Sequence, residues 1–183
     1  MRKPTDVCWF PMYCTYGSEL KVKEELDKQH VDNFIPMEYR LIDHHGERRR
    51  ELVPAIHNLI FVHHTQEEIT KLKMFNKSCV TMQYMVSRVH NGDELSEIIF
   101  IPDDQMNNFI QVASKVSEDL VYLKYEDFLD KVSRKVKIID GCFAGAEGVI
   151  KRIKKDRVVV ILLEGVAAVA ITNICPEYLQ FVD

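Results

Sequence analysis

The spacing of apolar and polar residues changes several times along the chain, and each spacing indicates one kind of secondary structure. Residues 8–15 combine aromatic and bulky side chains over a short stretch, which predicts a strand. Pro11 lies inside this stretch and has no backbone N–H to donate to a neighbouring strand. The sequence therefore predicts a strand at a sheet edge, or one with a bulge at Pro11.

A turn and a charged helix are predicted directly after this strand. Gly17 supplies the turn, and Ser18 belongs to the residue types that cap helix N-termini. The helix is expected over residues 19–29, because Val22 and Leu26 lie four residues apart and would share its inner side.

The middle of the chain predicts further strands and one short helix. Their ranges are 33–42, 52–62 and 79–89 for the strands and 66–73 for the helix. Residues 44–51 lie between the first two of these strands, are polar and show no periodicity. We therefore expect them to form an exposed hairpin loop.

The clearest helical spacing begins at Pro102, and the two acidic residues that follow it suit the positive end of a helix dipole. The apolar side chains of this helix recur at helical intervals, at Met106, Phe109, Ile110, Ala113 and Val116. The pattern weakens after Ser117, and we predict two domains, residues 1–123 and residues 124–183.

The last part of the chain predicts a small domain made of strands. Residues 158–163 and 166–171 are continuous β-branched and apolar runs, which imply strands covered on both faces or closed into a small barrel. Residues 154–157 predict the turn before the first of these runs. Three upstream glycines permit tight loops and close backbone contacts, at Gly141, Gly145 and Gly148.

Composition and charge narrow the class of protein. The chain has 183 residues, of which 46% are hydrophobic and 28% charged, as in soluble globular proteins. No apolar run approaches the roughly 20 residues of a membrane helix, and the first residues lack a secretory signal, so we expect a cytoplasmic protein with no membrane partner. The net charge of -4 argues against binding nucleic acid through bulk charge, although residues 131–157 hold nine basic and three acidic side chains.

The residue types that bind metals or perform catalysis form no recognisable motif. The five cysteines are scattered and are expected to be small core residues in a reducing compartment; they are Cys8, Cys14, Cys79, Cys142 and Cys175. His63 and His64 would point to opposite faces of a strand and cannot easily share one ion. The chain has no phosphate-binding loop, no nucleophile elbow and no cysteine with a motif-spaced histidine. We expect no enzyme, no metal and no other cofactor.

Two parts of the chain resemble the two domains of NusG-type transcription elongation factors. The N-terminal domain of that family is similar to the run from Trp9 to Thr15, the helix start Gly17-Ser18-Glu19, the segment Phe34-Ile35-Pro36-Met37, and Ile101-Pro102 before an acidic helix. The KOW motif of that family is similar to Gly141-x-Phe143-x-Gly145-x-x-Gly148-x-Ile150. The UpxY-type paralogs of capsular-polysaccharide loci are similar in Gly148-Val-Ile-Lys-Arg-Ile, Val158-Val-Val and Ala167-Ala-Val-Ala-Ile.

This resemblance implies an α+β fold, with an N-terminal antiparallel sheet and packed helices followed by a small SH3-like β-barrel. It also implies a processive antiterminator without chemistry of its own. The first domain would bind the clamp helices of RNA polymerase, near non-template DNA or nascent RNA, and suppress pausing and termination. The KOW domain would recruit a ribosomal protein or Rho.

The resemblance further implies three sets of contact residues. The set for RNA polymerase is Tyr13, Tyr16, Ile56, Leu59 and Phe61, although strand alternation means that some of them belong to the core. The set for nucleic acid is Lys21, Lys23, Arg48, Arg49 and Arg50, which could equally form a solvated helix face and loop. The set for a KOW partner is Phe143, Lys151, Arg152, Lys154, Lys155 and Arg157, where a charged turn could also serve solubility alone.

One segment departs from the family pattern. Family members usually carry an aromatic-Pro-Gly-Tyr segment at the entry to their third strand, whereas this chain reads Ile56-His57-Asn58-Leu59-Ile60-Phe61. The departure favours a divergent paralog over the general housekeeping factor. An alternative function is that of an RNA- or ribosome-binding KOW protein, for which Phe143 and Tyr178 are the evident rings that could stack on bases.

Overall fold

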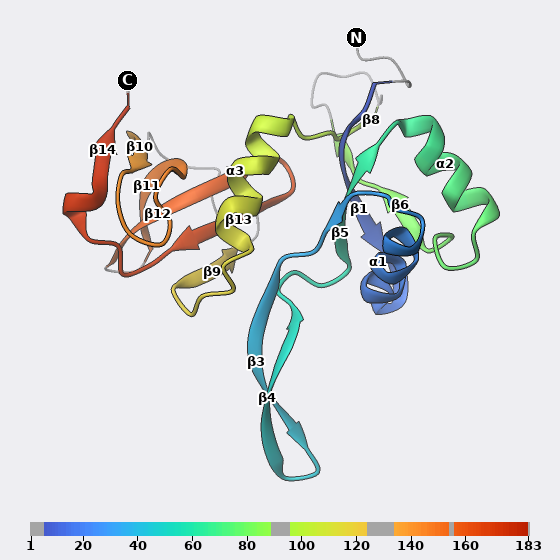
Figure 1. Ribbon diagram of the computed structural model, residues 1–183, viewed down its shortest axis with the longest axis horizontal. Helices are drawn as coiled ribbons and strands as arrows, with labels where there is room; N and C mark the ends of the chain where they lie inside the picture. Colours follow the sequence, from blue (N-terminus) through green and yellow to red (C-terminus); the bar gives the residue numbers. More distant parts are fainter. Residues whose placement is uncertain (1–5, 89–95, 124–133, 154–155, 183) are drawn as a thin grey trace. The chain divides into compact units, whose positions relative to one another are not determined.

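The computed structural model describes residues 6–88, 96–123, 134–153 and 156–182 (Figure 1). The chain divides into two compact units. Unit 1 comprises Met1–Ile35 and Ile56–Asp103, and unit 2 comprises Pro36–Ala55 and Asp104–Asp183. Within the described residues, no helix is both long enough and apolar enough to cross a membrane.

Unit 1 is built on an antiparallel sheet of four strands. Their order across the sheet is β2 (Asn33–Phe34), β5 (Leu59–His64), β1 (Cys8–Cys14) and β6 (Met82–Tyr84). Trp9 lies opposite His63 and Tyr13 lies opposite Leu59, so the first predicted strand pairs with β5 along almost its whole length. The first strand prediction is confirmed, whereas β5 covers only the end of the strand predicted over residues 52–62.

The edge position predicted for Pro11 is wrong, because β1 lies inside the sheet. Pro11 pairs with Phe61 of β5, while β6 pairs with β1 only from Met12 onward. Beyond β6, the Met85 N–H donates to the Pro11 carbonyl at 3.3 Å. The N and O atoms of one residue point to the same side of an antiparallel strand, so the missing N–H of Pro11 faces the side on which the ladder with β6 has ended.

The two predicted helices of unit 1 are confirmed. α1 spans Glu19–Lys28 and α2 spans Gln66–Phe75. Their inner side chains are fully buried, at Val22, Leu26 and Ile69. In each helix the buried side lies against the apolar layer of the unit, which is where most helical stability arises in proteins.

The two helix starts use their hydroxyl residues differently. Thr65 caps α2, and its hydroxyl accepts from the Glu68 N–H at 3.2 Å. Ser18 occupies the N-cap position of α1 as predicted, but its hydroxyl donates to the Thr15 carbonyl at 2.8 Å and caps no helix N–H. Ser18 therefore fixes the turn before α1.

The strand predicted over residues 79–89 is divided into two short strands. The first is β6, and the second, β7 (Val86–Arg88), pairs with β8 (Ser96–Ile98) in a separate hairpin. The segment Asn91-Gly92-Asp93, whose composition predicts a turn, lies outside the described residues.

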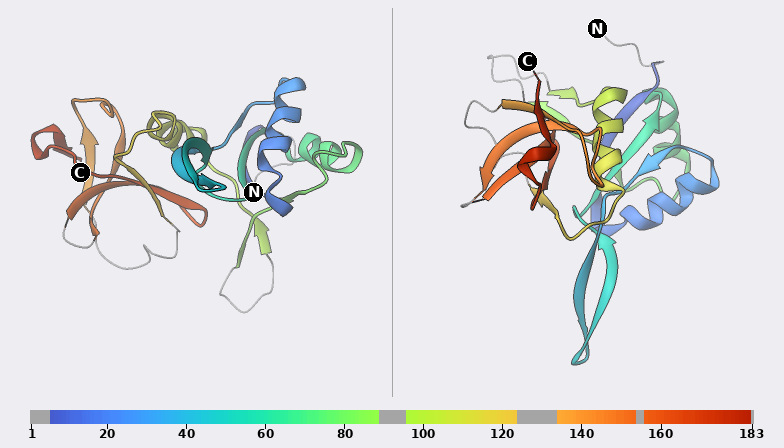
Figure 2. Two further views of the ribbon diagram at one scale, coloured as in Figure 1. Left: turned by 90° about the horizontal axis from the view of Figure 1, so that it is seen from below. Right: turned by 60° about the vertical axis from the view of Figure 1, so that its left-hand side comes forward.

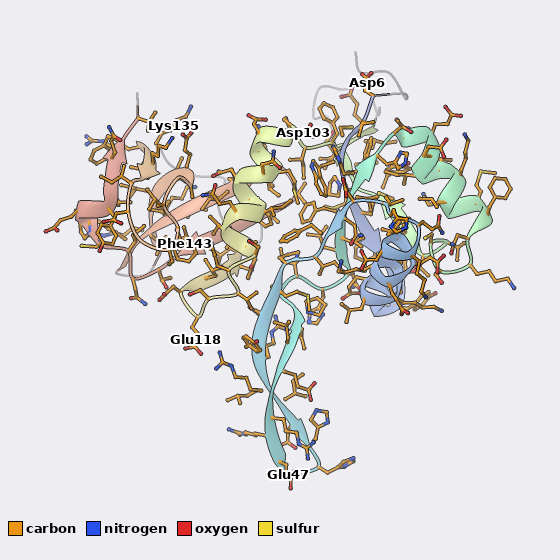
Figure 3. The ribbon with its side chains drawn as sticks, viewed as in Figure 1. Asp6, Glu47, Asp103, Glu118, Lys135 and Phe143 are labelled. Carbon is orange, nitrogen blue, oxygen red and sulfur yellow. The ribbon has the colours of Figure 1, made fainter. Side chains whose placement is uncertain are left out.

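Unit 2 contains a long two-stranded ribbon of β3 (Met37–His44) and β4 (Glu47–Pro54). The exposed hairpin predicted over residues 44–51 is present, but most of this segment is strand and the loop is shorter than predicted. The turn is only two residues long, with φ 54° at His45 and φ 94° at Gly46, as in the tight turns that match strand twist. Glu47 lies at the tip of the ribbon, and side chains project from both of its faces (Figure 3). β3 overlaps the strand predicted over residues 33–42, whereas β4 begins with charged residues and shows no apolar period. The sequence pattern therefore does not reveal the ribbon as a whole.

α3 (Asp103–Ala113) confirms the strongest helix prediction. Its buried side chains are Met106, Phe109, Val112 and Ala113. Val116, expected on the same helix, lies beyond the helix end with φ 47°. The helix ends earlier than predicted because a left-handed residue cannot continue a right-handed helix.

The C-terminal part of unit 2 is an antiparallel sheet of six strands (Figure 2). Their order is β14 (Leu179–Phe181), β10 (Arg134–Ile138), β11 (Glu147–Ile153), β12 (Asp156–Leu163), β13 (Ala167–Ile171) and β9 (Leu120–Leu123). The two predicted apolar runs form β12 and β13, and β13 is buried at every residue. The predicted α+β fold class is confirmed.

One glycine of the C-terminal motif explains how closely β11 and β12 approach each other. A Cβ atom at Gly148 would lie 2.6 Å from the Val160 carbonyl oxygen, a distance that no side chain tolerates. Gly148 is thus required by packing and not by turn geometry. Lys154 and Lys155, predicted to belong to a turn, lie outside the described residues.

The cysteines divide into two groups. Cys8, Cys14 and Cys79 are buried, as predicted for small core residues. Cys142 and Cys175 are exposed, so the prediction that they belong to the core is wrong.

Candidate functional site

Two exposed tyrosines of unit 1 precede α1 in the chain. Tyr13 is the one exposed residue of β1, at 44%, and Tyr16 is 97% exposed in the 3-10 turn Thr15–Gly17. Both belong to the set predicted to bind polymerase, and we call the pair the tyrosine surface. Ile56, from the same set, lies in the turn before β5 and is half-buried.

Asn58 connects the tyrosine surface to its surroundings through four hydrogen bonds. Its backbone N–H donates to Glu19 Oε1 at 3.2 Å, and its carbonyl accepts from the Cys14 N–H at 2.7 Å. Its side-chain Oδ1 accepts from the Gly17 N–H at 3.0 Å, and its Nδ2 donates to the Tyr13 hydroxyl at 3.2 Å. One residue thus joins β1, the 3-10 turn and α1. Asn58 is not among the predicted site residues, although an asparagine in a turn between strands is a usual signal of left-handed backbone.

Both Asn58 and Tyr16 have left-handed backbone conformations. Asn58 has φ 63°, which asparagine adopts more readily than other non-glycine residues. Tyr16 has φ 61° and ψ 27°, a conformation that costs an ordinary L-residue about 1–2 kcal/mol. The neighbouring amides hold it, because the Thr15 N–H donates to the Thr81 carbonyl at 3.1 Å and the Gly17 N–H donates to Asn58. Strain that is held in this way is typical of functional surfaces.

Two residues of the predicted polymerase-binding set lie in the core. Leu59 is 5% exposed and Phe61 is fully buried. β5 runs between β2 and β1 and is covered on both faces over its first four residues, so alternation along it brings neither side chain to the surface. The set is therefore reduced to Tyr13, Tyr16 and Ile56.

A buried carboxylate lies beside this network. Glu19 is 4% exposed, and its Oε1 accepts from the Asn58 N–H, whereas its Oε2 has no hydrogen-bond partner among the described residues. Burial and, to a smaller extent, the Glu19 carboxylate raise the pKa of the Cys14 thiol to about 12. Cys14 is therefore a neutral core residue and not a reactive thiol.

The two lysines of α1 that were predicted to contact nucleic acid differ in whether they already have an ion-pair partner. Lys23 forms an ion pair with Asp27 at 3.1 Å and donates to Asn33 Oδ1 at 3.1 Å. Lys21 is exposed, and no ion pair of it is found among the described residues. Of the two, Lys21 is the better placed to contact a phosphate without losing an existing partner.

The three adjacent arginines lie on β4 and do not form one cationic cluster. Alternation along the strand places Arg48 and Arg50 on one face of the ribbon and Arg49 on the other. Arg49 pairs with Glu47 at 2.9 Å. Arg50 pairs with Glu118 at 2.8 Å, and its guanidinium lies over the Tyr39 ring at 4.4 Å.

The face of the ribbon that holds Arg50 also exposes apolar side chains that the sequence analysis did not single out. They are Tyr39, Leu41 and Leu52. Tyr39 lies opposite Leu52 and Leu41 lies opposite Arg50, so the four side chains share one face. A cleft of about 540 Å³ opens beside them and extends to Glu118 within unit 2. The spacing of Tyr39 and Leu41 is the available signal in the sequence, but two residues are too few to define a surface.

Only some of the residues predicted to bind a KOW partner are exposed. Phe143 is 6% exposed and belongs to the core, so the prediction that it lies on the partner surface is wrong. Lys151 is half-buried, while Arg152 and Arg157 are exposed and lie directly opposite each other on β11 and β12. Like charges at opposed positions destabilise a sheet, so this pair is a candidate contact for an anionic partner. Lys154 and Lys155 lie outside the described residues.

α3 holds the start of β11 and the loop before it through two polar side chains. Asn108 Nδ2 donates to the Glu147 carbonyl at 2.7 Å, and its Oδ1 accepts from the Glu147 N–H at 2.9 Å, as a neighbouring strand would do. Gln111 Nε2 donates to the Ala144 carbonyl at 2.8 Å. These hydrogen bonds lie within unit 2 and satisfy backbone groups at the start of β11.

The adjacent histidines do not make a metal site. His63 stacks on Trp9 with ring centroids 4.8 Å apart, and its Nε2 lies 3.3 Å from Asp103 Oδ1. Among the described residues, no group of three or more His, Cys, Asp or Glu side chains could hold a metal ion.

Comparison with known proteins gives a family and a related structure. The family described as "Transcription termination factor nusG" matches residues 7–110, a range that includes the tyrosine surface and Asn58. A solved structure described as "Domain interaction in Thermotoga maritima NusG" matches at 18% identity and a TM-score of 0.49, covering 99% of this chain and 100% of that chain. None of the curated proteins matches the sequence.

Proposed function

Because the chain belongs to the NusG family of transcription elongation and termination factors, we propose that it is a processive antiterminator of RNA polymerase. Members of this family bind RNA polymerase and are not enzymes. The finer assignment is that this chain suppresses pausing and termination at particular operons, of which capsular-polysaccharide operons are our first candidates. The observation that carries the proposal is the tyrosine surface, exposed and held in place inside the matched range.

In this proposal residues 1–123 bind the clamp helices of the polymerase. Tyr13, Tyr16 and Ile56 supply aromatic and aliphatic contact area, and aromatic anchors often dominate such interfaces. The bound factor disfavours open, paused states of the polymerase because it binds the closed state better. Each 1.4 kcal/mol of differential binding changes the ratio of the two states about tenfold.

Nucleic acid near the bound domain would meet Lys21 and the ribbon arginines. Lys21 and Arg48 have no ion-pair partner among the described residues, so they can contact phosphates directly. Lys23, Arg49 and Arg50 would first have to give up a carboxylate partner. We therefore assign the phosphate contacts to non-template DNA or nascent RNA chiefly to Lys21 and Arg48.

The second domain, residues 124–183, would recruit another factor. Arg152 and Arg157 form its exposed cationic pair, with Lys151 beside Arg152 on β11. A ribosomal protein or Rho with an acidic surface would relieve the repulsion between the paired arginines.

An in vitro transcription assay on a template with a pause site and a terminator tests this proposal. The full chain should lower pause lifetimes and raise readthrough, and Tyr13→Ala should lose the effect. Phe75→Ala is the matched control, because Phe75 is an exposed aromatic side chain of unit 1 on α2, outside the proposed contact set. Increased termination with the wild-type chain would instead identify a termination factor of the same family.

The alternative function is that of an RNA- or ribosome-binding KOW protein. The single observation in its favour is the exposed cationic pair of Arg152 and Arg157. Its aromatic support is weak, because Phe143 is buried and the Tyr178 ring packs beside Gly141 and is 36% exposed. A chain that leaves transcription unchanged and binds RNA through Arg152 and Arg157 would make this alternative the leading one.

A further inference from the structure

We propose that Asn58 is a positioning residue that holds the tyrosine surface in the geometry a binding partner meets. The inference rests on the proposed function, since it assumes that Tyr13 and Tyr16 contact the polymerase. Asn58 itself need not touch the partner. It acts through the two tyrosines.

The first reason is that Asn58 uses all of its polar groups on this surface. Its two backbone groups bond to Glu19 and Cys14, and its two side-chain groups bond to Gly17 and Tyr13. All four partners belong to one short stretch of the chain, residues 13–19, which lies 39 to 45 positions before Asn58. A residue that served only its own turn would bond to neighbours a few positions away.

The second reason is the conformation of the residues that it holds. Tyr16 is left-handed at φ 61°, and two amides that flank it in the chain, those of Cys14 and Gly17, both donate to Asn58. Without these bonds the 3-10 turn would depend on the Thr15–Thr81 and Ser18–Thr15 bonds, because the Tyr16 side chain is almost fully exposed and packing contributes little to keep it there. Asn58 therefore contributes directly to where the most exposed aromatic ring of unit 1 projects.

The third reason is that the anchor of Asn58 is itself buried. Only 4% of Glu19 is exposed, and its carboxylate accepts from the Asn58 N–H. A buried acceptor holds its donor more firmly than an exposed one, because water cannot compete for the bond. The tyrosine surface is thus connected to the core through Asn58.

The expected consequence is pre-organisation for binding. Immobilising a flexible side chain on association weakens binding by about three- to tenfold for each residue, and a surface that is already held avoids this loss. Removing the Asn58 side chain should therefore weaken polymerase binding even though the tyrosines remain. The loss should appear mainly in faster dissociation.

Asn58→Gly in the full chain is the main test, with affinity for immobilised core RNA polymerase as the readout. Glycine accepts φ 63° without strain, so the backbone turn persists while both side-chain bonds are lost. We expect about tenfold weaker binding and faster hydrogen exchange at the Gly17 amide. Asn76→Gly is the matched control, because Asn76 also makes two side-chain hydrogen bonds, to Glu25 and the Ser78 N–H. It should reduce stability and leave affinity unchanged.

Tyr13→Phe separates positioning from a general structural role. It keeps the ring and removes the hydroxyl that accepts from Asn58, so it should weaken binding by a smaller factor, about threefold. In the double variant with Asn58→Gly it should add nothing, because the bond is already absent. Equal affinity of wild type, Asn58→Gly and Tyr13→Phe would overturn the inference.

The failure of this inference can be told apart from that of the proposed function. If the wild-type chain does not bind the polymerase, the proposed function fails. If it binds and Tyr13→Ala weakens it, but Asn58→Gly and Tyr13→Phe do not, only the positioning role fails. If Asn58→Gly does not fold, Tyr13→Phe decides the question, since it changes one exposed hydroxyl.

Discussion

Tyr16 combines almost full exposure with a strained backbone, so its replacement by glycine should raise stability relative to alanine while the loss of the ring weakens binding. The side chain is 97% exposed and contributes almost no burial, while φ 61° costs an L-residue about 1–2 kcal/mol. Tyr16→Gly removes this strain, and the extra freedom of glycine in the unfolded chain offsets about 0.4–1 kcal/mol of the gain. Tyr16→Ala removes the same ring but keeps the strain. We therefore expect Tyr16→Gly to be about 0.5–1 kcal/mol more stable than Tyr16→Ala.

Urea unfolding of the two variants measures this difference. The midpoint should be higher for Tyr16→Gly at an unchanged slope, because the surface exposed on unfolding is nearly the same in both. Both variants should bind the polymerase roughly 30-fold more weakly than the wild-type chain, as expected for loss of an interface anchor of about 2 kcal/mol. Equal midpoints would refute the strain argument. Unchanged affinity in both variants would refute the place of Tyr16 in the interface.

Three further outcomes follow from packing, protonation and burial. Gly148→Ala should lower the free energy of unfolding by about 1–3 kcal/mol, because its Cβ would lie 2.6 Å from the Val160 carbonyl oxygen; a thermal melt with an unchanged midpoint would contradict this. A hydrogen bond from Asn33 and, after it, the contact with Lys23 lower the pKa of Asp27. The stability that this carboxylate contributes is therefore present above its ordinary pKa of 3.8 and is lost as the pH falls through the lower folded value. Asn33→Ala should raise the Asp27 pKa in an NMR titration. Burial raises the pKa of Cys14 to about 12, so a thiol reagent near neutral pH should label the two exposed cysteines in the folded chain and Cys14 only after unfolding.

The parts of the fold that can be predicted from the sequence are those with a buried face. α1 and α3 carry apolar residues at helical spacing, and β13 is an uninterrupted apolar run, so each pattern reports burial directly. The ribbon of β3 and β4 can be predicted only in part, because β3 carries alternating apolar residues and overlaps a predicted strand, whereas most of β4 is charged and has no apolar period. Its turn at His45 and Gly46 is the one local signal of a ribbon, and the same two residues are equally compatible with a loop.

The site can be predicted only in part, because its organisation depends on contacts between distant residues. Tyr13 and Tyr16 follow from the family resemblance, and both are exposed. Phe61 is aromatic, as many interface anchors are, but its strand is covered on both faces. No local pattern in the sequence reveals that coverage. Asn58 bonds to Tyr13 across 45 residues of sequence. In the sequence the segment 56–61 lacks the family pattern, yet Asn58 adopts the positive φ that glycine usually supplies.

The central claim is that the tyrosine surface binds RNA polymerase at the clamp helices. The most direct measurement is the affinity of the full chain for core RNA polymerase, with an isolated clamp-helix fragment as competitor and Tyr13→Ala and Phe75→Ala as paired variants. The fragment should compete the binding away, and Phe75→Ala should bind as the wild type does. Tyr13→Ala should bind at least about tenfold more weakly, which corresponds to about 1.4 kcal/mol. Binding that neither the fragment nor Tyr13→Ala reduces would contradict the claim.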